Sequence, residues 1–483
     1  MTWLLAGLSG LLLTLIFPKF DLTLLVAFAL VPLLVAIARE PNWRRRLLLG
    51  ELCGFVFWMG VCYWIRPVLA AYGGLTPSLA WLTVVLFALV KGLHTAVFAA
   101  AAGCVIHRAW AIPAIGALWV GIERTHSTFG FAWLALGNAG ADMDFAARVA
   151  PFTGVYGLSF IFVAMNMAVA LILLRRPRLH LVWLLPLLGL FLFPALPESP
   201  GKSDEAAGSR SIVALQSNLK ENEKPSLLGM GVRSAAASIA GPEMIVWPEV
   251  PTGFYWDRDS DFQQAMDRLA RWTSKPVLFG GVTFDNQGRP YNSAILIGSD
   301  GKELGRYSKM NLVPFGEFIP PLFGWIEKIS TEAGDFAPGE QLKVLPVNDL
   351  KLGTFICYES AFPHFVRRFA REGANVLINI SNDGWFFDTA AREQHLLLAR
   401  MRAIENRRWL VRVTNNGITA SIDPSGRVRQ QQPEFRATAA RLRFDPIAET
   451  TVYSRVGDWF AWSCLALAIA LVIRAELPAR RHL

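Results

Sequence analysis

The sequence predicts an integral membrane protein that joins an eight-span α-helical bundle to an α/β sandwich domain. Three observations support this prediction. The 483 residues are 53% hydrophobic and have a mean hydropathy of +0.35, which is too apolar for an ordinary soluble enzyme. Apolar runs long enough to cross a bilayer recur through residues 1–196 and once more near the C-terminus. Residues 211–450 instead alternate short β-rich runs with helical patterns.

The sequence predicts four regions along the chain. A transmembrane domain with seven helices covers 1–196, and a polar linker covers 197–210. The soluble domain at 211–450 is followed by an eighth span and a cytoplasmic tail at 451–483. The first span lacks a basic amino-terminal region and a small-residue cleavage site, so we interpret it as a helix and not as a signal peptide. The spans are expected at 3–17, 22–38, 48–68, 79–105, 109–124, 152–174, 179–196 and 457–474.

The basic residues of the membrane region predict its orientation. If the N-terminus is cytoplasmic, nearly every basic cluster between the spans falls on the cytoplasmic side, as the positive-inside rule requires. The soluble domain then lies outside the cytoplasm. The net charge of +9 is otherwise scattered, so we expect no nucleic-acid partner. The residues that set this orientation are Arg39, Arg44, Arg45, Arg46, His107, Arg108, Arg175, Arg176, Arg178, Arg474, Arg480 and Arg481.

Within the soluble domain, β-rich runs and helical segments can be assigned in order. The runs before and after 299–301 favour a hairpin. Helices are expected at 261–273, 363–372 and 390–407. Strands are expected at 211–218, 243–249, 275–281, 291–298, 303–309, 350–356 and 375–383, and in the closing stretches WLVRVTNN (409–416) and GITASID (417–423).

Three residues with complementary chemistry stand at the ends of predicted strands. Cys357 is a nucleophile candidate, Glu249 can take its proton, and Lys309 can stabilise both a thiolate and an oxyanion. The backbone N–H of Tyr358 is a natural second oxyanion donor. The alternative is a buried structural cysteine with two solvated charges. Pro248 fixes the backbone directly before Glu249, which argues against an ordinary solvated charge at that position.

The other cysteines favour no metal or disulfide framework. Cys53, Cys62, Cys104 and Cys464 lie in strongly apolar stretches, without a CxxC pair or a histidine partner. Cys357 is therefore the only cysteine of a domain expected in an oxidising compartment. A lone thiol there is a liability unless it is buried or used.

Several stretches resemble a known family. WPE (247–249), YSKMNLVPFGEFIP (307–320) and ICYES (356–360) resemble the nitrilase superfamily, which has a Glu-Lys-Cys triad in an αββα sandwich. The whole chain resembles the apolipoprotein N-acyltransferase family. LVPFGE after the lysine and CYE at the nucleophile separate that family from soluble nitrilases. TGVYGLSF (153–160), NDGWF (382–386) and the run from 394 to 419 support the resemblance.

The resemblance implies roles for individual residues. Glu249 would be the general base, Lys309 the oxyanion-stabilising lysine, and Cys357 the nucleophile. Glu317 would orient the lysine or protonate groups around it. The other supporting or substrate-contacting positions would be the CYE residues Tyr358 and Glu359 and the active-site asparagine Asn292.

The sequence departs from the family pattern in places. QSNLKENEKP (216–225) lacks an expected tryptophan. The Ala-, Ser- and Gly-rich segment 220–242 is less like an ordinary amphipathic helix. Ala132 replaces a usual proline in GFAW (130–133). These departures concern substrate recognition and not the triad.

The implied activity is acyl transfer from a membrane phospholipid, through a Cys357 thioester, to the α-amine of a diacylated apolipoprotein. The implied location is the bacterial cytoplasmic (inner) membrane, with the catalytic domain on the periplasmic side. We expect no cofactor, no metal and a monomer. Two alternatives remain open, a membrane-tethered amidase or nitrilase acting on a small amide and a non-catalytic lipid-binding scaffold.

Two further features have competing interpretations. The loop 310–340 is rich in apolar residues and is either a lipid-contacting lid or a loop folded on its own domain. Lys91 and His94 lie one helical turn apart in the fourth span. They are either a functional intramembrane pair or a lysine that reaches toward the interface. The apolar residues of the loop are Phe315, Phe318, Ile319, Leu322, Phe323, Trp325 and Ile326.

Overall fold

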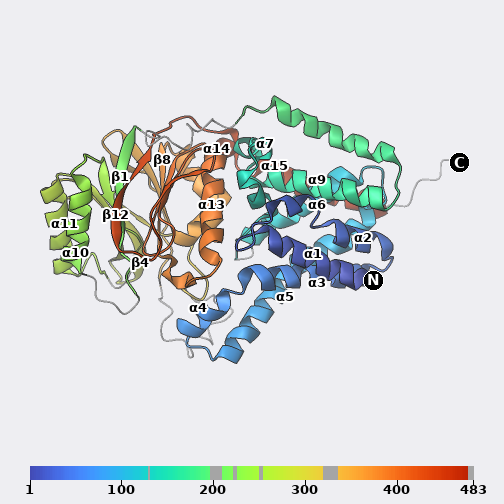
Figure 1. Cartoon of the computed structure of the whole chain (residues 1–483), viewed down its shortest axis with the longest axis horizontal. Coiled ribbons are helices and arrows are strands. Elements are labelled where there is room, and N and C mark those ends of the chain that lie inside the picture. The colour runs from blue at the N-terminus through green and yellow to red at the C-terminus, as the bar shows by residue number, and fades with distance from the viewer. Residues whose placement is uncertain (129–130, 196–208, 221–225, 250–253, 319–335, 477–483) are drawn as a thin grey trace.

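The computed structural model describes residues 1–128, 131–195, 209–220, 226–249, 254–318 and 336–476. A helical bundle and an αββα sandwich lie side by side along the long axis of the molecule (Figure 1). The last helix, α15, returns from the sandwich into the bundle beside α6 and α9. The predicted linker at 197–210 lies almost wholly outside the described residues.

The bundle is built from helices of unequal length. Gly54 on α3 faces Gly92 on α5, and a Cβ added at Gly54 would lie 2.7 Å from the Gly92 Cα. Small residues at this crossing let the two backbones approach closely. The bundle elements are α1 Thr2–Ile16, η1 Thr23–Ala27, α2 Val31–Arg39, α3 Trp43–Cys62, α4 Ile65–Ala71, α5 Pro77–Val105, α6 Ala111–Arg124, η2 Thr125–Ser127, η3 Leu136–Asp142, α7 Asp144–Ala147, α8 Ala150–Thr153, α9 Val155–Leu173, η4 Arg178–Leu192 and α15 Trp459–Glu476.

Among the described residues, three helices are long and apolar enough to cross a membrane: α5, α9 and α15. The α3–α4 pair, bent by 56°, makes a fourth if it counts as one span. Four predicted spans are shorter or irregular, and the one at 109–124 is α6, a helix of 14 residues. The span at 3–17 is a helix of 15 residues, that at 22–38 is divided between η1 and α2, and that at 179–196 is the 3₁₀ helix η4 with Pro186 inside it. Proline and 3₁₀ geometry interrupt regular helix where hydropathy alone favours an unbroken one.

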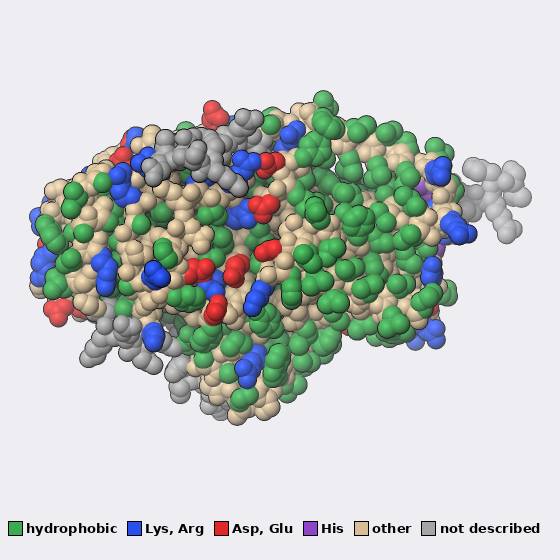
Figure 2. Space-filling view, viewed as in Figure 1, with side chains coloured by type: hydrophobic (Ala, Val, Ile, Leu, Met, Phe, Trp, Pro, Cys, Tyr) green, Lys and Arg blue, Asp and Glu red, His purple; other side chains and the backbone are tan. Residues whose placement is uncertain are grey.

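The surface of the bundle differs from that of the sandwich. Figure 2 shows hydrophobic side chains over most of the visible face of the bundle, with Lys and Arg at the end farthest from the sandwich. The sandwich surface carries charged and polar groups in larger number. An apolar exterior over helices is typical of a lipid-facing surface.

Two six-stranded sheets form the centre of the sandwich. Their strand orders are β12-β1-β2-β3-β4-β5 and β11-β10-β9-β8-β7-β6. In each sheet a parallel core continues into antiparallel strands, and β4 and β5 form the predicted hairpin. The strands are β1 Arg210–Gln216, β2 Met244–Val246, β3 Val277–Phe284, β4 Pro290–Ile297, β5 Glu303–Ser308, β6 Leu345–Val347, β7 Leu350–Ile356, β8 Val376–Ser381, β9 Leu410–Thr414, β10 Ala420–Ile422, β11 Val428–Gln431 and β12 Thr438–Phe444.

Alternation along the strands divides the core into two layers. On β1, Val213 and Leu215 pack toward α10 and α11, whereas Ile212 and Ala214 join the larger core that continues into the bundle. Successive strand residues point to opposite faces, so one apolar run serves both layers. The covering helices are α10 Leu227–Ser238 and α11 Ser260–Thr273 on one side, and α12 Pro363–Arg371 and α13 Ala391–Asn406 on the other. The short helix α14 Val452–Val456 packs against α12, α13 and α8.

Helix α13 joins the sandwich to the bundle. Gln394, near its start, donates to the carbonyls of Pro18 (2.9 Å) and Val61 (3.1 Å) and accepts from the Trp133 indole (2.8 Å). Near its end, Glu405 accepts from the Val155 backbone N–H at 2.9 Å. These polar contacts are buried on both sides, so they fix how the sandwich sits on the bundle.

The soluble-domain assignments agree with the structure in most elements. The helices expected at 261–273, 363–372 and 390–407 are α11, α12 and α13. Strands β6, β11 and β12 were not expected. The segment from 220 to 242 contains the helix α10, although its composition is unlike an ordinary amphipathic helix. Met230 of α10 packs in the outer core layer, and Ser234 accepts from the Trp247 indole at 3.0 Å.

Replacing Glu405 should destabilise the junction between sandwich and bundle. Arg402, whose side chain is 1% exposed, donates to Glu405 at 2.6 and 2.8 Å. In Glu405→Ala that guanidinium stays buried without its carboxylate, so the free energy of unfolding should fall by about 3–5 kcal/mol. Thermal unfolding of the full-length protein in detergent measures the effect.

The matched control is Asp267→Ala on α11. It removes a similar helical ion pair to Arg271, whose side chain is 59% exposed, and should cost less than about 1 kcal/mol. Equal shifts in Tm for the two variants would contradict the assigned role of Glu405.

Candidate active site

Glu249, Lys309 and Cys357 come from three strands in two sheets. Glu249 follows β2 by three residues, Lys309 comes directly after β5, and Cys357 comes directly after β7. All three are buried, with exposed fractions of 6%, 1% and 7%. Strand ends of facing sheets bring residues distant in sequence to one edge of a sandwich. The structure therefore gathers the three positions that the sequence singled out.

The Lys309 ammonium is the centre of the charge arrangement. Its Nζ lies 3.3 Å from Glu249 Oε1 and 2.9 Å from Glu317. Asn292 bridges the two carboxylates, donating from Nδ2 to each at 2.8 Å. The Lys309 backbone N–H also donates to the Asn292 carbonyl at 2.8 Å. Glu317 and Asn292 thus hold the lysine and the general-base candidate in one network.

Electrostatics set the charge states in this network. Burial alone would lower the Lys309 pKa, but the Glu249 and Glu317 carboxylates oppose it and hold that pKa well above its ordinary value. Burial raises the pKa of the Cys357 thiol, and the Glu249 carboxylate raises it further, while Lys309 lowers it. The resting site therefore contains a lysine cation and a neutral thiol, which needs a base before it can attack.

Glu249 is further held from the second sheet. The backbone N–H of Asn382, just after β8, donates to Glu249 Oε2 at 2.8 Å. One carboxylate oxygen thus faces the lysine and the other is bound by the NDGWF segment. The NDGWF segment supports the family resemblance, but the sequence alone assigned none of its residues a role in the site. Asn382 could have been identified from the sequence as a polar residue directly after β8, the strand that pairs in parallel with β7.

Glu359 lies beneath the site and serves the backbone around it. It accepts from the Tyr307 hydroxyl (2.7 Å) and from the backbone N–H groups of Met310 (2.8 Å), Asn311 (3.1 Å) and Ile356 (2.8 Å). This carboxylate ties the segment after Lys309 to the residue before Cys357. Its contacts are those of a structural residue.

Tyr358 faces the bundle. Its ring stacks on Phe131, with centroids 5.8 Å apart, and on Trp133, with centroids 6.4 Å apart. Both aromatic residues belong to the segment after α6, which includes Ala132 of the GFAW stretch. The residue after the nucleophile is thus packed against the membrane domain.

Part of the apolar loop at 310–340 lies outside the described residues, including Ile319, Leu322, Phe323, Trp325 and Ile326. Its two ends are anchored at the site. Glu317 Oε2 accepts from the Val313 N–H at 2.8 Å, and the Gly339 N–H donates to the Lys309 carbonyl at 2.8 Å. Phe315 is 42% exposed. Both interpretations of the loop stay predictions.

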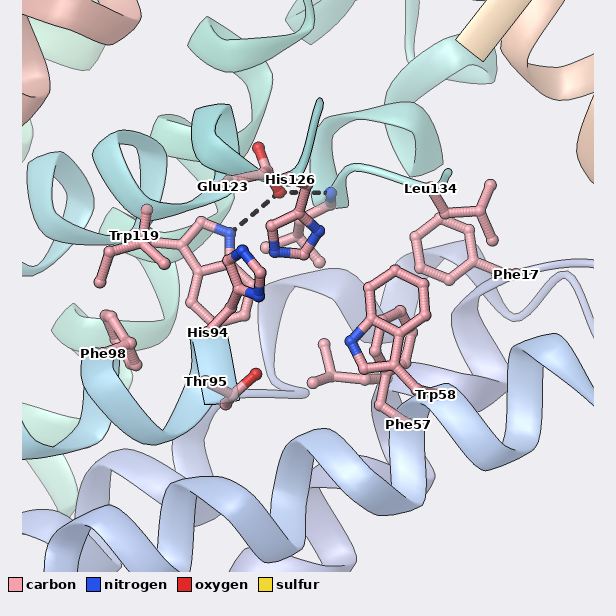
Figure 3. A pocket seen from close by; sticks show the side chains of 13 residues that line it. Phe17, Phe57, Trp58, His94, Thr95, Phe98, Trp119, Glu123, His126 and Leu134 are labelled. Carbon is pink, nitrogen blue, oxygen red and sulfur yellow. Dashed lines mark hydrogen bonds between the residues drawn. The ribbon is translucent and has the colours of Figure 1, made fainter. Parts of the chain in front are cut away.

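Of the intramembrane pair on the fourth span, Lys91 is buried and His94 is partly buried. Lys91, 5% exposed, donates to the Phe131 carbonyl at 3.0 Å and lies 4.7 Å from the Trp58 ring. Its ammonium is therefore enclosed by protein, and both interpretations of the pair stay predictions. His94 packs against His126 with ring centroids 4.1 Å apart, on one side of a small, mostly apolar cavity that Trp58 and Glu123 also line (Figure 3). No group of three metal-ligating side chains occurs among the residues described.

The sandwich is a carbon-nitrogen hydrolase domain, and it is joined to a bundle that contains long apolar helices. A family model described as carbon-nitrogen hydrolase matches residues 207–447, and one described as apolipoprotein N-acyltransferase N-terminal domain matches 9–168. An amidase from Nesterenkonia sp. is a similar solved structure, with 18% identity, a TM-score of 0.41, and coverage of 53% of this chain and 96% of that one.

Curated relatives extend the match to the full chain. The apolipoprotein N-acyltransferases of Geobacter metallireducens and Azotobacter vinelandii are each 32% identical to it, over 99% of this chain and 95% of the relative. The chain belongs to the apolipoprotein N-acyltransferase family.

Alkylation of Cys357 should report its raised thiol pKa. An exposed cysteine has a pKa of about 8.5, so its alkylation rate levels off soon above that pH. The rate at Cys357 should instead keep rising through pH 9.5. Lys309→Met removes the cation that favours the thiolate, so alkylation of Cys357 at pH 8 should be slower in this variant by about tenfold or more. Iodoacetamide labelling, resolved by peptide mass spectrometry, measures both.

Lys302→Met is the matched control, because its side chain is 83% exposed at the β4–β5 turn. It should leave the rate unchanged. A plateau below pH 8, or equal rates in the two lysine variants, would refute the electrostatic description of the site.

Proposed function

We propose that this chain transfers an acyl chain from a membrane phospholipid to the α-amino group of the diacylglyceryl-cysteine of an apolipoprotein, the last step of bacterial lipoprotein maturation. One observation carries the proposal. A buried thiol, a carboxylate and a lysine cation meet in a sandwich whose α13 is docked on an apolar bundle. The family of the chain supplies the substrates.

In the first half-reaction Cys357 is the nucleophile. Glu249 takes the thiol proton, and the thiolate attacks the ester carbonyl of the phospholipid. The oxyanion that forms is stabilised by Lys309 and by the Tyr358 N–H. The intermediate collapses, the ester C–O bond breaks, and the lysophospholipid oxygen takes the proton from Glu249. A thioester on Cys357 remains.

In the second half-reaction the acceptor amine attacks the thioester. Glu249 takes a proton from the amine, the C–S bond breaks, and the Cys357 sulfur recovers the proton. The product is an amide. Glu317 and Asn292 keep Glu249 and Lys309 in place through both steps, which fits their contacts of 2.8–2.9 Å. Ping-pong kinetics follow from this scheme.

We further propose the arrangement in the membrane. Residues 1–196 and 451–483 form the eight-span domain, 197–210 the linker, and 211–450 the catalytic domain on the periplasmic side of the inner membrane. Two contacts between basic loops support a common cytoplasmic end. Arg176 contacts the His107 ring, and Arg108 donates to the Ala475 carbonyl at 2.8 Å. Both substrates are lipid-anchored and reach a monomer from within the bilayer.

Acyl transfer tests the proposal directly. Purified full-length protein, given phospholipid and a diacylated lipopeptide, should produce a triacylated peptide. In Cys357→Ala the acyl adduct on the protein should vanish. Glu249→Gln should slow adduct formation by about 10²-fold or more, as expected for loss of a general base. Quenched samples analysed by intact mass spectrometry give the adduct yield and rate.

Asp285→Asn, at an exposed ion pair with Arg289, is the control and should behave as wild type. Hydrolysis of a small amide without transfer to the lipopeptide would favour the amidase alternative. An adduct that persists in Cys357→Ala would eliminate Cys357 as the nucleophile.

Thiol labelling in spheroplasts tests the orientation. Single cysteines introduced at Lys302, at the β4–β5 turn, and at Arg45, before the apolar part of α3, are both exposed. A membrane-impermeant maleimide should label Lys302→Cys in intact spheroplasts and Arg45→Cys only after lysis. The reverse pattern would overturn the proposed topology.

A further inference from the structure

The nucleophile has an unusual backbone conformation. Cys357 has φ of +49°, in the left-handed region that side-chain-bearing residues rarely adopt. Such a conformation costs about 1–3 kcal/mol and persists only when the surrounding structure holds it. The contact that holds the next peptide is buried: the Nε2 of His395 lies 3.0 Å from the Cys357 carbonyl oxygen.

His395 is fixed on every side. It is fully buried on α13, and its Nδ1 lies 3.1 Å from Asp383 Oδ1 and 3.0 Å from Arg412 Nη2. Arg412 in turn donates to both oxygens of Asp383, at 2.7 and 2.6 Å, and to the Asn379 side chain at 2.6 Å. An imidazole bounded in this way has one orientation, and its Nε2 edge faces the nucleophile.

The chemistry of the partners fixes where the proton resides. A carbonyl oxygen can only accept, so Nε2 must carry the hydrogen that reaches Cys357. Arg412 can only donate, so Nδ1 of a neutral imidazole accepts from it. Burial and the Arg412 cation lower the pKa of His395 by more than the Asp383 carboxylate raises it, which favours that neutral form. Protonation at Nδ1 would not remove the Nε2 hydrogen, and the bond to Cys357 exists in both states.

The held carbonyl belongs to the same peptide unit as the Tyr358 N–H. A peptide is planar, with its C=O and N–H directed to opposite sides. A hydrogen bond that fixes the Cys357 carbonyl therefore fixes the direction of the Tyr358 N–H. It also polarises that N–H, because hydrogen bonds in series strengthen one another.

We propose that His395 is a positioning residue for the oxyanion donor: through the Cys357–Tyr358 peptide it aims the Tyr358 N–H at the oxygen of the tetrahedral intermediate. The inference rests on the acyl-transfer function proposed above. It assigns His395 no contact with substrate. The aromatic side chains of Trp133 and Phe386, with centroids 5.9 and 5.6 Å from the imidazole, complete its enclosure.

Two amide variants separate the donor from the rest of the network. His395→Gln places an amide N–H near the position of Nε2 and can still donate to Cys357. His395→Asn is one methylene shorter, so it keeps a polar group near Asp383 and Arg412 but does not reach the carbonyl. His364→Asn is the matched control, because this half-buried histidine of α12 has no hydrogen bond to Cys357 among the contacts of the described residues.

The readout compares two reactions of the same thiol in the full-length protein. Acylation of Cys357 by p-nitrophenyl butyrate passes through an oxyanion, whereas alkylation by iodoacetamide does not. We expect His395→Asn to slow acylation by about 10²-fold, the usual cost of losing one oxyanion donor, and alkylation by less than about threefold. His395→Gln should stay within about tenfold of wild type in acylation.

Three results would overturn the proposal: equal acylation rates in His395→Asn and wild type, equal losses in the Asn and Gln variants, or a parallel loss of alkylation. Loss of acylation in the His364→Asn control would also contradict it. The p-nitrophenyl ester needs no phospholipid, so these outcomes are independent of the proposed substrates. A wild-type protein that is acylated by the ester but forms no triacylated lipopeptide would refute only the proposed function.

Discussion

The burial of one lysine cation constrains the whole catalytic domain. Removing an ammonium ion from water costs several kcal/mol, and only well-placed opposite charges offset that cost. Lys309 is 1% exposed and has two carboxylates within 3.3 Å, and Asn292 bridges them. Each of these partners comes from a different segment. The β4–β5 register, the loop after β5 and the end of β2 must therefore all be correct together.

The second constraint is the junction with the bundle. Helix α13 is packed on the sheet that carries Cys357 and also hydrogen-bonds the bundle through Gln394 and Glu405. On the same helix, His395 contacts the nucleophile's carbonyl. The side of the site that faces the bundle is thus made partly of membrane-domain residues such as Phe131 and Trp133. This arrangement puts the candidate site directly beside the apolar bundle.

Sequence patterns predicted elements well where burial is one-sided or complete. The strand before Cys357 and the helix at 390–407 were both expected, because their apolar periods are clear. Strand β12 was not, since Arg441 and Arg443 alternate along a half-exposed edge that is identified only by its pairing with β1. The helical breaks near 28–30 and 63–64 were also missed, because hydropathy averages over them.

The sequence by itself determined the division into apolar and soluble parts, the strand ends at Glu249, Lys309 and Cys357, and the chemistry available there. These depend on composition and on local order along the chain. Only the tertiary structure decided which groups surround them. The Asn292 bridge, the Asn382 N–H on Glu249 and the His395 contact join residues between 25 and 133 positions apart. Such contacts follow from how two sheets and a helix pack, and a pattern read along one strand or helix contains no information on that packing.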